Sequence, residues 1–410
     1  MSLATSLFGA QHTIGYLTHW TDPGGPIDLV TGTGISQSAR QKNAAGLQRA
    51  LNSHLLADGD TVTFPGEGTV IEIEGQIEVS NKDSINLNGG TGTTIQQFDP
   101  FSNTLIIGEG CSGWSIHDFT FSTELANHLQ TGVLPEDPTN RPDDRGCLLR
   151  LRGDTLFIYD NHFVAAYEFG VHIGAETPTT STSGDNVYVY GNTFDYTIGD
   201  GVHMIRGSGS WIASNTFNYT GDDSIAVNAW DSDGSADCYV WLNVINNAGN
   251  RGIISGTPSG TYSPTSIHIG YNDINGTRGS AIEVHSPQGS GSEIVNNNID
   301  GAGMYTMVWD TNVDPAQYWD GGTHTTGDSY GHAIYIKDST LGFTVSGNTI
   351  TNASLHGIFE HSSQPVSFSG LSANNSISSW LLEDPAGTYW SDAGSDAPSS
   401  LGTGAAVVEW

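Results

Sequence analysis

Apolar residues recur in phase with asparagine along most of the chain, from about Ser84 onward. In each repeat a large apolar residue follows the Asn after two positions, and in seven of eight repeats another apolar residue follows eight positions later. Intervals of 31, 23, 28, 29 and 25 residues separate the first six asparagines, and a period of about 20–50 residues is typical of solenoids. Short alternating strands without helices between them favour a parallel β-helix over a helical or leucine-rich array. The asparagines are Asn161, Asn192, Asn215, Asn243, Asn272, Asn297, Asn348 and Asn375.

The asparagine column itself predicts a structural device. Asn is a good turn residue on its own, but eight of them in phase favour a ladder in which stacked side-chain amides hydrogen-bond from one coil to the next. The sequence therefore predicts an all-β fold, a single-stranded parallel β-helix.

The segment before the repeats has a different periodicity. Residues 38–60 predict one helix, because Ala44, Leu47, Leu51 and Leu55 recur at helical spacing and Gly59 stops it. A helix at this place is expected to cap the first coil, since an open solenoid end exposes both core and strand edges.

Three domains follow from these patterns. Residues 1–37 are expected to form an attachment or capping segment, 38–380 the parallel β-helix with its N-terminal helix, and 381–410 a non-repeat tail. Two long segments, 125–145 and 311–330, interrupt the register. Loops of that length more often form the walls of a functional site than serve as plain connections.

Charged residues occupy the same phase of consecutive repeats. The position eight residues after the asparagine holds Asp200, Asp223 and Arg251 in three successive coils, and Asp222 precedes Asp223. Coils of a β-helix stack about 4.8 Å apart, so these side chains are expected to converge on one face. A neighbouring row, three positions further on, holds His172, His203 and Glu283, with His285 close by.

Such convergence predicts acid–base chemistry. Like charges about 5 Å apart raise one pKa, so one Asp can keep its proton while another stays ionised. Glycosidic cleavage requires that pair of states. We therefore predict Asp200, Asp222 and Asp223 as catalytic and His172, His203, Arg251, Glu283 and His285 as substrate-binding. Sugar binding without cleavage, and turn residues bonded to their own backbone, remain alternatives.

These motifs resemble a known family. TIGDGVHM, TGDDSIAV and GNRGI look like the active-site coils of polygalacturonase-type glycoside hydrolases (family 28), which are right-handed parallel β-helices. The resemblance implies that Asp200, Asp222 and Asp223 are the acid and base carboxylates. Arg251 stands where the family has His, and Glu283 and His285 stand in place of Arg-Ile-Lys, whose cations bind the substrate carboxylate. Polygalacturonan is therefore not the expected substrate.

Composition narrows the range of partners. The formal charge is −32, with 12 Lys and Arg against 44 Asp and Glu, which argues against nucleic-acid binding and is compatible with a halophilic setting.

Cys111, Cys147 and Cys238 match no disulfide framework or zinc pattern and are expected to be buried thiols. We expect no metal or cofactor, no signal peptide and no membrane insertion.

The opening GDTVTFPGEGTV resembles that of the pectate-lyase-like superfamily, which is common in phage tailspikes. The first expectation is therefore a viral tailspike or tail-fibre protein, located in the virion tail, that binds and hydrolyses a host surface polysaccharide. The resemblance implies a homotrimer and contacts with other virion tail proteins. Two alternatives remain: a free extracellular carbohydrate-active enzyme (hydrolase or lyase), and a non-catalytic receptor-binding virion protein.

Overall fold

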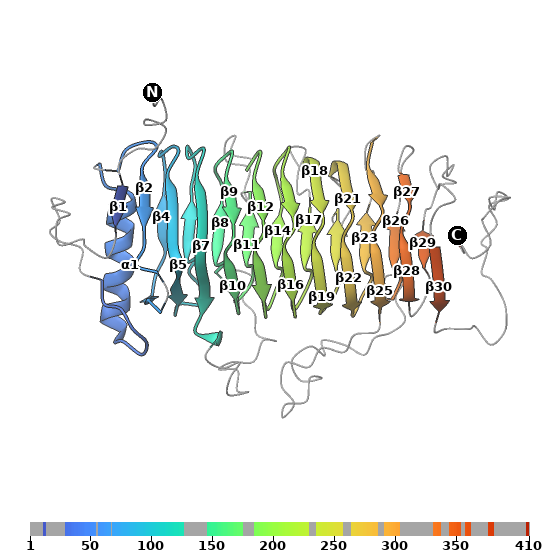
Figure 1. The fold of residues 1–410 in the computed structure, drawn as a ribbon, viewed down its shortest axis with the longest axis horizontal. Coiled ribbons are helices and arrows are strands. Elements are labelled where there is room, and N and C mark those ends of the chain that lie inside the picture. The colour runs from blue at the N-terminus through green and yellow to red at the C-terminus, as the bar shows by residue number, and fades with distance from the viewer. Residues whose placement is uncertain are drawn as a thin grey trace, which may run out of the picture. The chain divides into compact units, whose positions relative to one another are not determined.

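The structure is a computed structural model. It describes residues 11–13, 29–54, 56–66, 68–126, 146–174, 184–228, 235–256, 264–285, 291–303, 331–337, 344–353, 357–361, 376–380 and 407–409. The chain divides into two compact units, Met1–Ile198 and Gly199–Trp410. Each unit is a stack of parallel β-coils (Figure 1), and the predicted insertions fall almost entirely outside the described residues.

The first unit combines one helix with two parallel sheets. The long sheet contains β1 (Gln11–Thr13), β2 (Thr61–Thr63), β3 (Val70–Ile73), β5 (Asn86–Gln97), β7 (Ser115–Thr123), β9 (Phe157–Tyr159), β10 (His162–Val164), β12 (Tyr188–Tyr190) and β13 (Thr193–Asp195). The short sheet contains β4 (Ile77–Val79), β6 (Leu105–Ile107), β8 (Leu149–Leu151) and β11 (Val171–Ile173).

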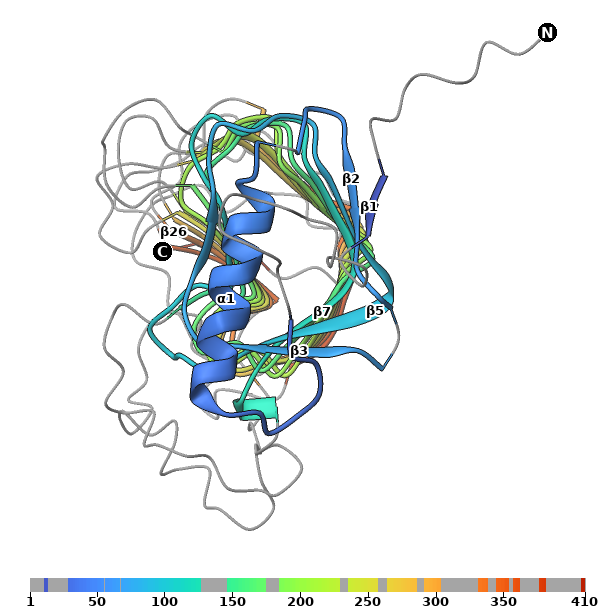
Figure 2. The same cartoon turned by 90° about the vertical axis from the view of Figure 1, so that its left-hand side faces the viewer.

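Helix α1 (Gln37–Leu51) lies across the first coil and packs on β3 and β4 (Figure 2). Its buried face includes Ala44, Leu47 and Leu51, as the helical spacing predicts. The prediction of a helix through residue 60 was too long. Asn52 ends the helix, because its side-chain amide donates to the carbonyl of Gln48 at 2.8 Å and to that of Glu78 at 2.7 Å.

The second unit repeats the same two sheets. Its long sheet contains β15 (Trp211–Ala213), β16 (Thr216–Asn218), β18 (Ala236–Trp241), β19 (Val244–Ala248), β21 (Thr265–Gly270), β22 (Asp273–Thr277), β24 (Glu293–Val295), β25 (Asn298–Ala302), β27 (Thr344–Ser346), β28 (Thr349–Ala353) and β30 (Ser376–Trp380). Its short sheet contains β14 (Val202–Met204), β17 (Ile225–Val227), β20 (Ile253–Ser255), β23 (Ile282–His285), β26 (Ile334–Lys337), β29 (Ile358–His361) and β31 (Val407–Glu409).

The asparagine ladder is confirmed in both units. In the second unit, the side-chain amides of Asn215 and Asn243 each donate to the carbonyl oxygen of the next Asn at 3.0 Å. Asn243 also donates to the backbone carbonyl of Ile212 at 2.8 Å. These amides are about 1 % exposed, so the ladder satisfies buried polar groups at a bend of the coil. Asn161 and Asn192 form the same contact in the first unit.

The short-sheet strands alternate between core and outer face. In β14, β17, β20 and β23 the first and third residues point inward, among them Val202, Ile225 and Ile253, which are completely buried. The middle residues, including His203 and Glu283, then lie on the outer face, because strand side chains alternate. This alternation places His203 and Glu283 on the same face of the short sheet of the second unit.

The predicted fold class, a right-handed parallel β-helix with an N-terminal helix, is confirmed. All three cysteines are buried thiols, as expected. Among the described residues no helix combines the length and apolarity that crossing a bilayer requires.

Candidate active site

Three stacked turns of the second unit carry the charged residues of the candidate site. Asp200 precedes β14, Asp222 and Asp223 precede β17, and Arg251 precedes β20. Backbone hydrogen bonds hold the turns in register: Asp222 N–H donates to the carbonyl of Gly199 at 3.2 Å. The turns therefore continue the hydrogen bonding of the short sheet, and equivalent side chains lie one above another.

Gly201, directly after Asp200, is required by close packing. A Cβ at this position would lie 2.5 Å from the ring of Phe217 and 2.7 Å from the carbonyl oxygen of Ser224. Only glycine lets the turn approach the next coil this closely. The Asp-Gly pair thus sets how closely the turn that carries Asp200 approaches the coil that carries Asp223.

The carboxylates of Asp200, Asp222 and Asp223, here called the aspartate cluster, come together as the sequence predicts. One oxygen of each lies within 4.8 Å of the others. The backbone N–H of Asp223 donates to Oδ1 of Asp200 at 2.9 Å, and Oδ2 of Asp200 lies 2.6 Å from Nδ1 of His203. Asp200 and Asp223 are buried at 4 % and 6 % exposure, whereas Asp222 is half-buried. Asp222 is therefore the member of the cluster most open to a substrate.

Arg251 connects the aspartate cluster to Glu283. Its Nη1 lies 3.3 Å from each carboxylate oxygen of Asp223, and its Nε donates to Oε2 of Glu283 at 2.7 Å. Glu283 is 1 % exposed and its other oxygen contacts Nε2 of His285. The chain of direct contacts thus runs from His203 through the cluster and Arg251 to His285.

The buried carboxylates differ in how readily they ionise. Burial raises the pKa of Asp200 and raises that of Asp223 well above the usual range, and the neighbouring Asp222 adds to both shifts. Burial would also raise the pKa of Glu283, but the hydrogen bond from His285 and the charge of Arg251 outweigh it and lower that pKa. The Asp223 and Glu283 carboxylates likewise raise the pKa of Arg251 against the effect of burial. The cluster thus favours a retained proton, and Glu283 favours ionisation.

The aspartate cluster is spaced closely enough for a divalent cation, but its oxygens have other partners. Both oxygens of Asp200 and both of Asp223 contact nitrogen groups, and Oδ1 of Asp222 accepts from Asn250 at 2.8 Å. Arg251 already supplies positive charge at this point. These contacts favour proton chemistry at the cluster over binding of a cation.

His172 has a different environment from the other predicted residues. It lies on β11 of the first unit, 1 % exposed, beside Arg150 in the sheet register, and its ring packs edge-on against Phe169 at 5.3 Å. The aspartate cluster and its four other predicted partners all belong to the second unit. Its burial and its contact with Phe169 indicate that His172 is a packed interior histidine.

Two neighbours of the site were not among the predicted residues. Asn250, which orients Asp222, directly precedes Arg251, so its position in the repeat was a usable signal. Tyr335 lies beside Glu283 in the sheet register and packs edge-on against His285 at 6.2 Å. Residues 304–330 separate it from the preceding coil in the chain, and counting by repeats does not reach across them.

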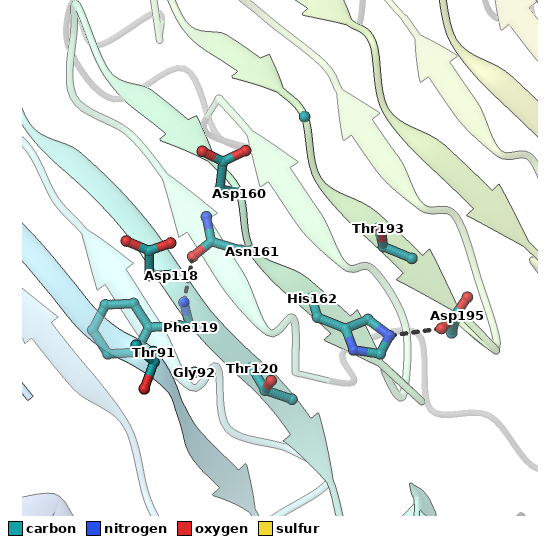
Figure 3. A pocket seen from close by; sticks show the side chains of 11 residues that line it. Thr91, Gly92, Asp118, Phe119, Thr120, Asp160, Asn161, His162, Thr193 and Asp195 are labelled. Atoms are coloured by element: carbon teal, nitrogen blue, oxygen red, sulfur yellow. Dashed lines mark hydrogen bonds and ion pairs between the residues drawn. The ribbon is translucent and has the colours of Figure 1, made fainter. Parts of the chain in front are cut away.

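A separate hollow lies on the long sheet of the first unit (Figure 3). It measures about 530 Å³, and its lining includes Asp118, Asp160 and an ion pair in which Nε2 of His162 lies 2.6 Å from Oδ2 of Asp195. None of the predicted site residues lines it. We therefore place the candidate active site at the aspartate cluster.

No protein-family model matches the chain, and no curated protein matches it. Among solved structures, endo-xylogalacturonan hydrolase from Aspergillus tubingensis is similar, with a TM-score of 0.50 and 9 % identity over 93 % of this chain and 98 % of that one. The A-module of a mannuronan C-5 epimerase from Azotobacter vinelandii has a TM-score of 0.43 and 13 % identity, over 86 % of this chain and 98 % of that one. The Agl-KA catalytic domain has a TM-score of 0.46 and 12 % identity, over 86 % of this chain and 62 % of that one. The likeness to the Aspergillus hydrolase shows a shared fold: this chain is a parallel β-helix protein.

Proposed function

We propose that this protein hydrolyses glycosidic bonds of a polysaccharide at the aspartate cluster. The observation that carries the proposal is the meeting of three carboxylates from consecutive coils within 4.8 Å, with Asp200 and Asp223 buried and Asp222 half-buried. Glycoside hydrolysis needs one carboxyl that is protonated and one that is ionised. Crowding of the three groups and burial of Asp200 and Asp223 favour that mixed state.

In this reaction the protonated carboxyl gives its proton to the glycosidic oxygen, and the bond from that oxygen to the anomeric carbon breaks. A water molecule forms the new bond to the anomeric carbon and passes its proton to an ionised carboxylate of the cluster. The cluster thus regains the proton that it lost. His203, in contact with Asp200, fixes the orientation of that carboxylate.

The charges at the site favour a neutral glycan at the point of cleavage. Arg251 is the cationic side chain that contacts the cluster, and Asp223 and Glu283 engage its Nη1 and Nε. A uronate carboxylate placed here would meet four acidic side chains. Abstraction of a proton next to such a carboxylate, as in a lyase, needs that charge neutralised. Hydrolysis of a neutral sugar has no such requirement.

We further propose that the chain works as a tailspike or tail-fibre component of a virus, with a host surface polysaccharide as substrate. The support is the β-helix body and the resemblance of the N-terminal sequence to the pectate-lyase-like superfamily, which is common in phage tailspikes. A homotrimer is the expected assembly, and light scattering coupled to size exclusion distinguishes it from a monomeric extracellular enzyme. Labelled antibody against the chain should decorate the tails of virions.

The test compares Asp223→Asn and Asp222→Asn with wild-type protein on a panel of neutral and acidic polysaccharides. Wild type should release reducing ends from at least one neutral glycan, without the ultraviolet absorbance of an unsaturated uronate. Each variant should lose about 10²–10⁴-fold in rate while retaining glycan binding. Cleavage at the wild-type rate by both variants rules out the cluster as the catalytic centre. Binding without cleavage by wild type indicates an adhesin instead.

A further inference from the structure

One guanidinium is shared between two buried carboxylates, and the sharing is unequal. Arg251 Nε lies 2.7 Å from Glu283, whereas Nη1 lies 3.3 Å from both oxygens of Asp223. A charge-assisted hydrogen bond weakens as it lengthens beyond about 2.9 Å. Glu283 therefore makes the shorter and stronger of the side-chain hydrogen bonds of Arg251.

The two carboxylates differ in their other partners. His285 contacts the second oxygen of Glu283, and Tyr335 lies beside Glu283 on the next strand. Asp223 has one further donor, the backbone N–H of Arg251, which lies 3.0 Å from its Oδ1. Asp223 also faces two other carboxylates, Asp200 and Asp222. The same low-dielectric surroundings thus stabilise a negative charge on Glu283 and oppose one on the aspartate cluster.

We propose that Glu283 is a positioning residue for the proton: by holding Arg251 it leaves Asp223 incompletely neutralised, so that the aspartate cluster keeps one proton for the leaving oxygen. Glu283 makes no contact with the reacting atoms in this scheme and acts through Arg251. The opposite directions of the pKa shifts of Asp223 and Glu283 agree with this division. The inference rests on the proposed function for its catalytic meaning, but the proton itself can be observed without a substrate.

The substitution that tests this is Glu283→Gln. Glutamine keeps the volume and an oxygen that accepts from Arg251 Nε, and only the charge is lost. Asp223 is then the charged partner of Arg251. In addition, the negative charge of Glu283, which lies near the cluster, is lost. Both effects make the cluster easier to ionise, so its apparent pKa should fall by about one unit or more.

The full-length chain, labelled with ¹³C at the aspartate carboxyl carbons, is titrated by NMR, and the cluster resonances are assigned by their loss in Asp223→Asn. The matched control is Glu293→Gln. Glu293 pairs with His268 at 3.0 Å on the long sheet, and its replacement removes the same charge from an ordinary surface pair. The cluster titration should be unchanged in this control. Thermal unfolding confirms that each variant is folded.

A second readout uses the pH profile of cleavage. If a cluster carboxyl is the acid, its loss of a proton sets the basic limb of kcat/KM, and Glu283→Gln should shift that limb to lower pH by the same amount. A purely structural role would lower the rate at all pH values and leave the limb in place. Conversely, Glu283→Asp, which retains the charge, should keep the wild-type limb.

The double variant Arg251→Gln/Glu283→Gln identifies the path. If Glu283 acts through Arg251, removing its charge changes the cluster pKa much less in the Arg251→Gln background than in wild type. An unchanged cluster titration in Glu283→Gln overturns this inference, even if wild type cleaves glycans. A lowered cluster pKa in a chain that cleaves no glycan upholds the role of Glu283 and overturns the proposed function.

Discussion

The backbone N–H of Asp223 donates a hydrogen bond to Oδ1 of Asp200 at 2.9 Å, although 23 residues separate the two in the chain. One carboxylate thus holds the next turn in place as well as belonging to the aspartate cluster. Its second oxygen contacts His203. Asp200 therefore has a structural task that can be separated from its charge.

Asp200→Asn is expected to retain the turn and lose the reaction. The amide oxygen still accepts from Asp223 N–H, but no carboxylate faces His203. We expect an unfolding midpoint close to that of wild type and a fall of about 10²–10⁴-fold in kcat, measured by reducing-end release. Asp200→Leu, which removes the acceptor too, should in addition lower stability by about 1–3 kcal/mol. Equal stability of the two variants would show that the hydrogen bond does not hold the turn.

Asp223→Asn is expected to gain stability relative to wild type as the pH rises. A carboxyl whose folded pKa is raised binds its proton more tightly in the native state than in the unfolded chain, where the value is about 3.9. Wild-type stability should therefore decline as pH increases from the unfolded pKa through the raised folded pKa. The amide does not ionise and avoids this loss. Thermal unfolding near pH 5 and pH 8 should show the variant gaining on wild type at the higher pH.

Arg251→Gln is expected to be severely destabilising. It leaves buried Glu283 and Asp223 without their cation, and breaking a buried ion pair costs about 3–5 kcal/mol. Addition of Glu283→Gln should restore part of this loss, because it removes the buried negative charge that Arg251 no longer neutralises. Chemical denaturation of the single and double variants measures both effects, and additive losses would contradict the coupling.

Asn243→Ala tests the asparagine ladder. The change removes the amide that donates to Asn272 and to the carbonyl of Ile212 and leaves buried acceptors unsatisfied, at a cost of about 1–3 kcal/mol for each such group. Asn298→Ala is the control, because its amide donates to Asp273 on the exposed surface, where changes usually stay within about 0.5 kcal/mol. Similar losses of unfolding free energy in the two variants would mean that the buried ladder stabilises the fold no more than an exposed amide contact does.

The coil architecture and the meeting of the acids could be predicted because both depend on register alone. Asn215 and Asn243 occupy the same phase, and once coils stack, so must Asp223 and Arg251 eight residues later. The direction of the Arg251 side chain could not be predicted in this way. It depends on competition between Asp223 and Glu283 for one guanidinium, and that competition is decided by distances of a few tenths of an ångström.

Other features depend on contacts between segments that no local pattern reveals. The end of α1 at Leu51 is set by the amide of Asn52 reaching Glu78 on another strand, whereas the apolar spacing alone continues to Leu55. Tyr335 joins the site across a long interruption of the repeat. His172 follows the periodic rule as well as His203 does, but it has its own packed surroundings in the first unit.

Asn297 and Asn348 make the same amide contact, at 2.9 Å, as Asn272 and Asn297, yet 51 residues separate the first pair and 25 the second. The stacking of coils therefore does not depend on how many residues separate two rungs in the chain. A foreign binding module could be inserted into such a coil while the aspartate cluster keeps its geometry. Changes of target could then arise by exchanging the sequence between two rungs, while the rungs themselves stay the same.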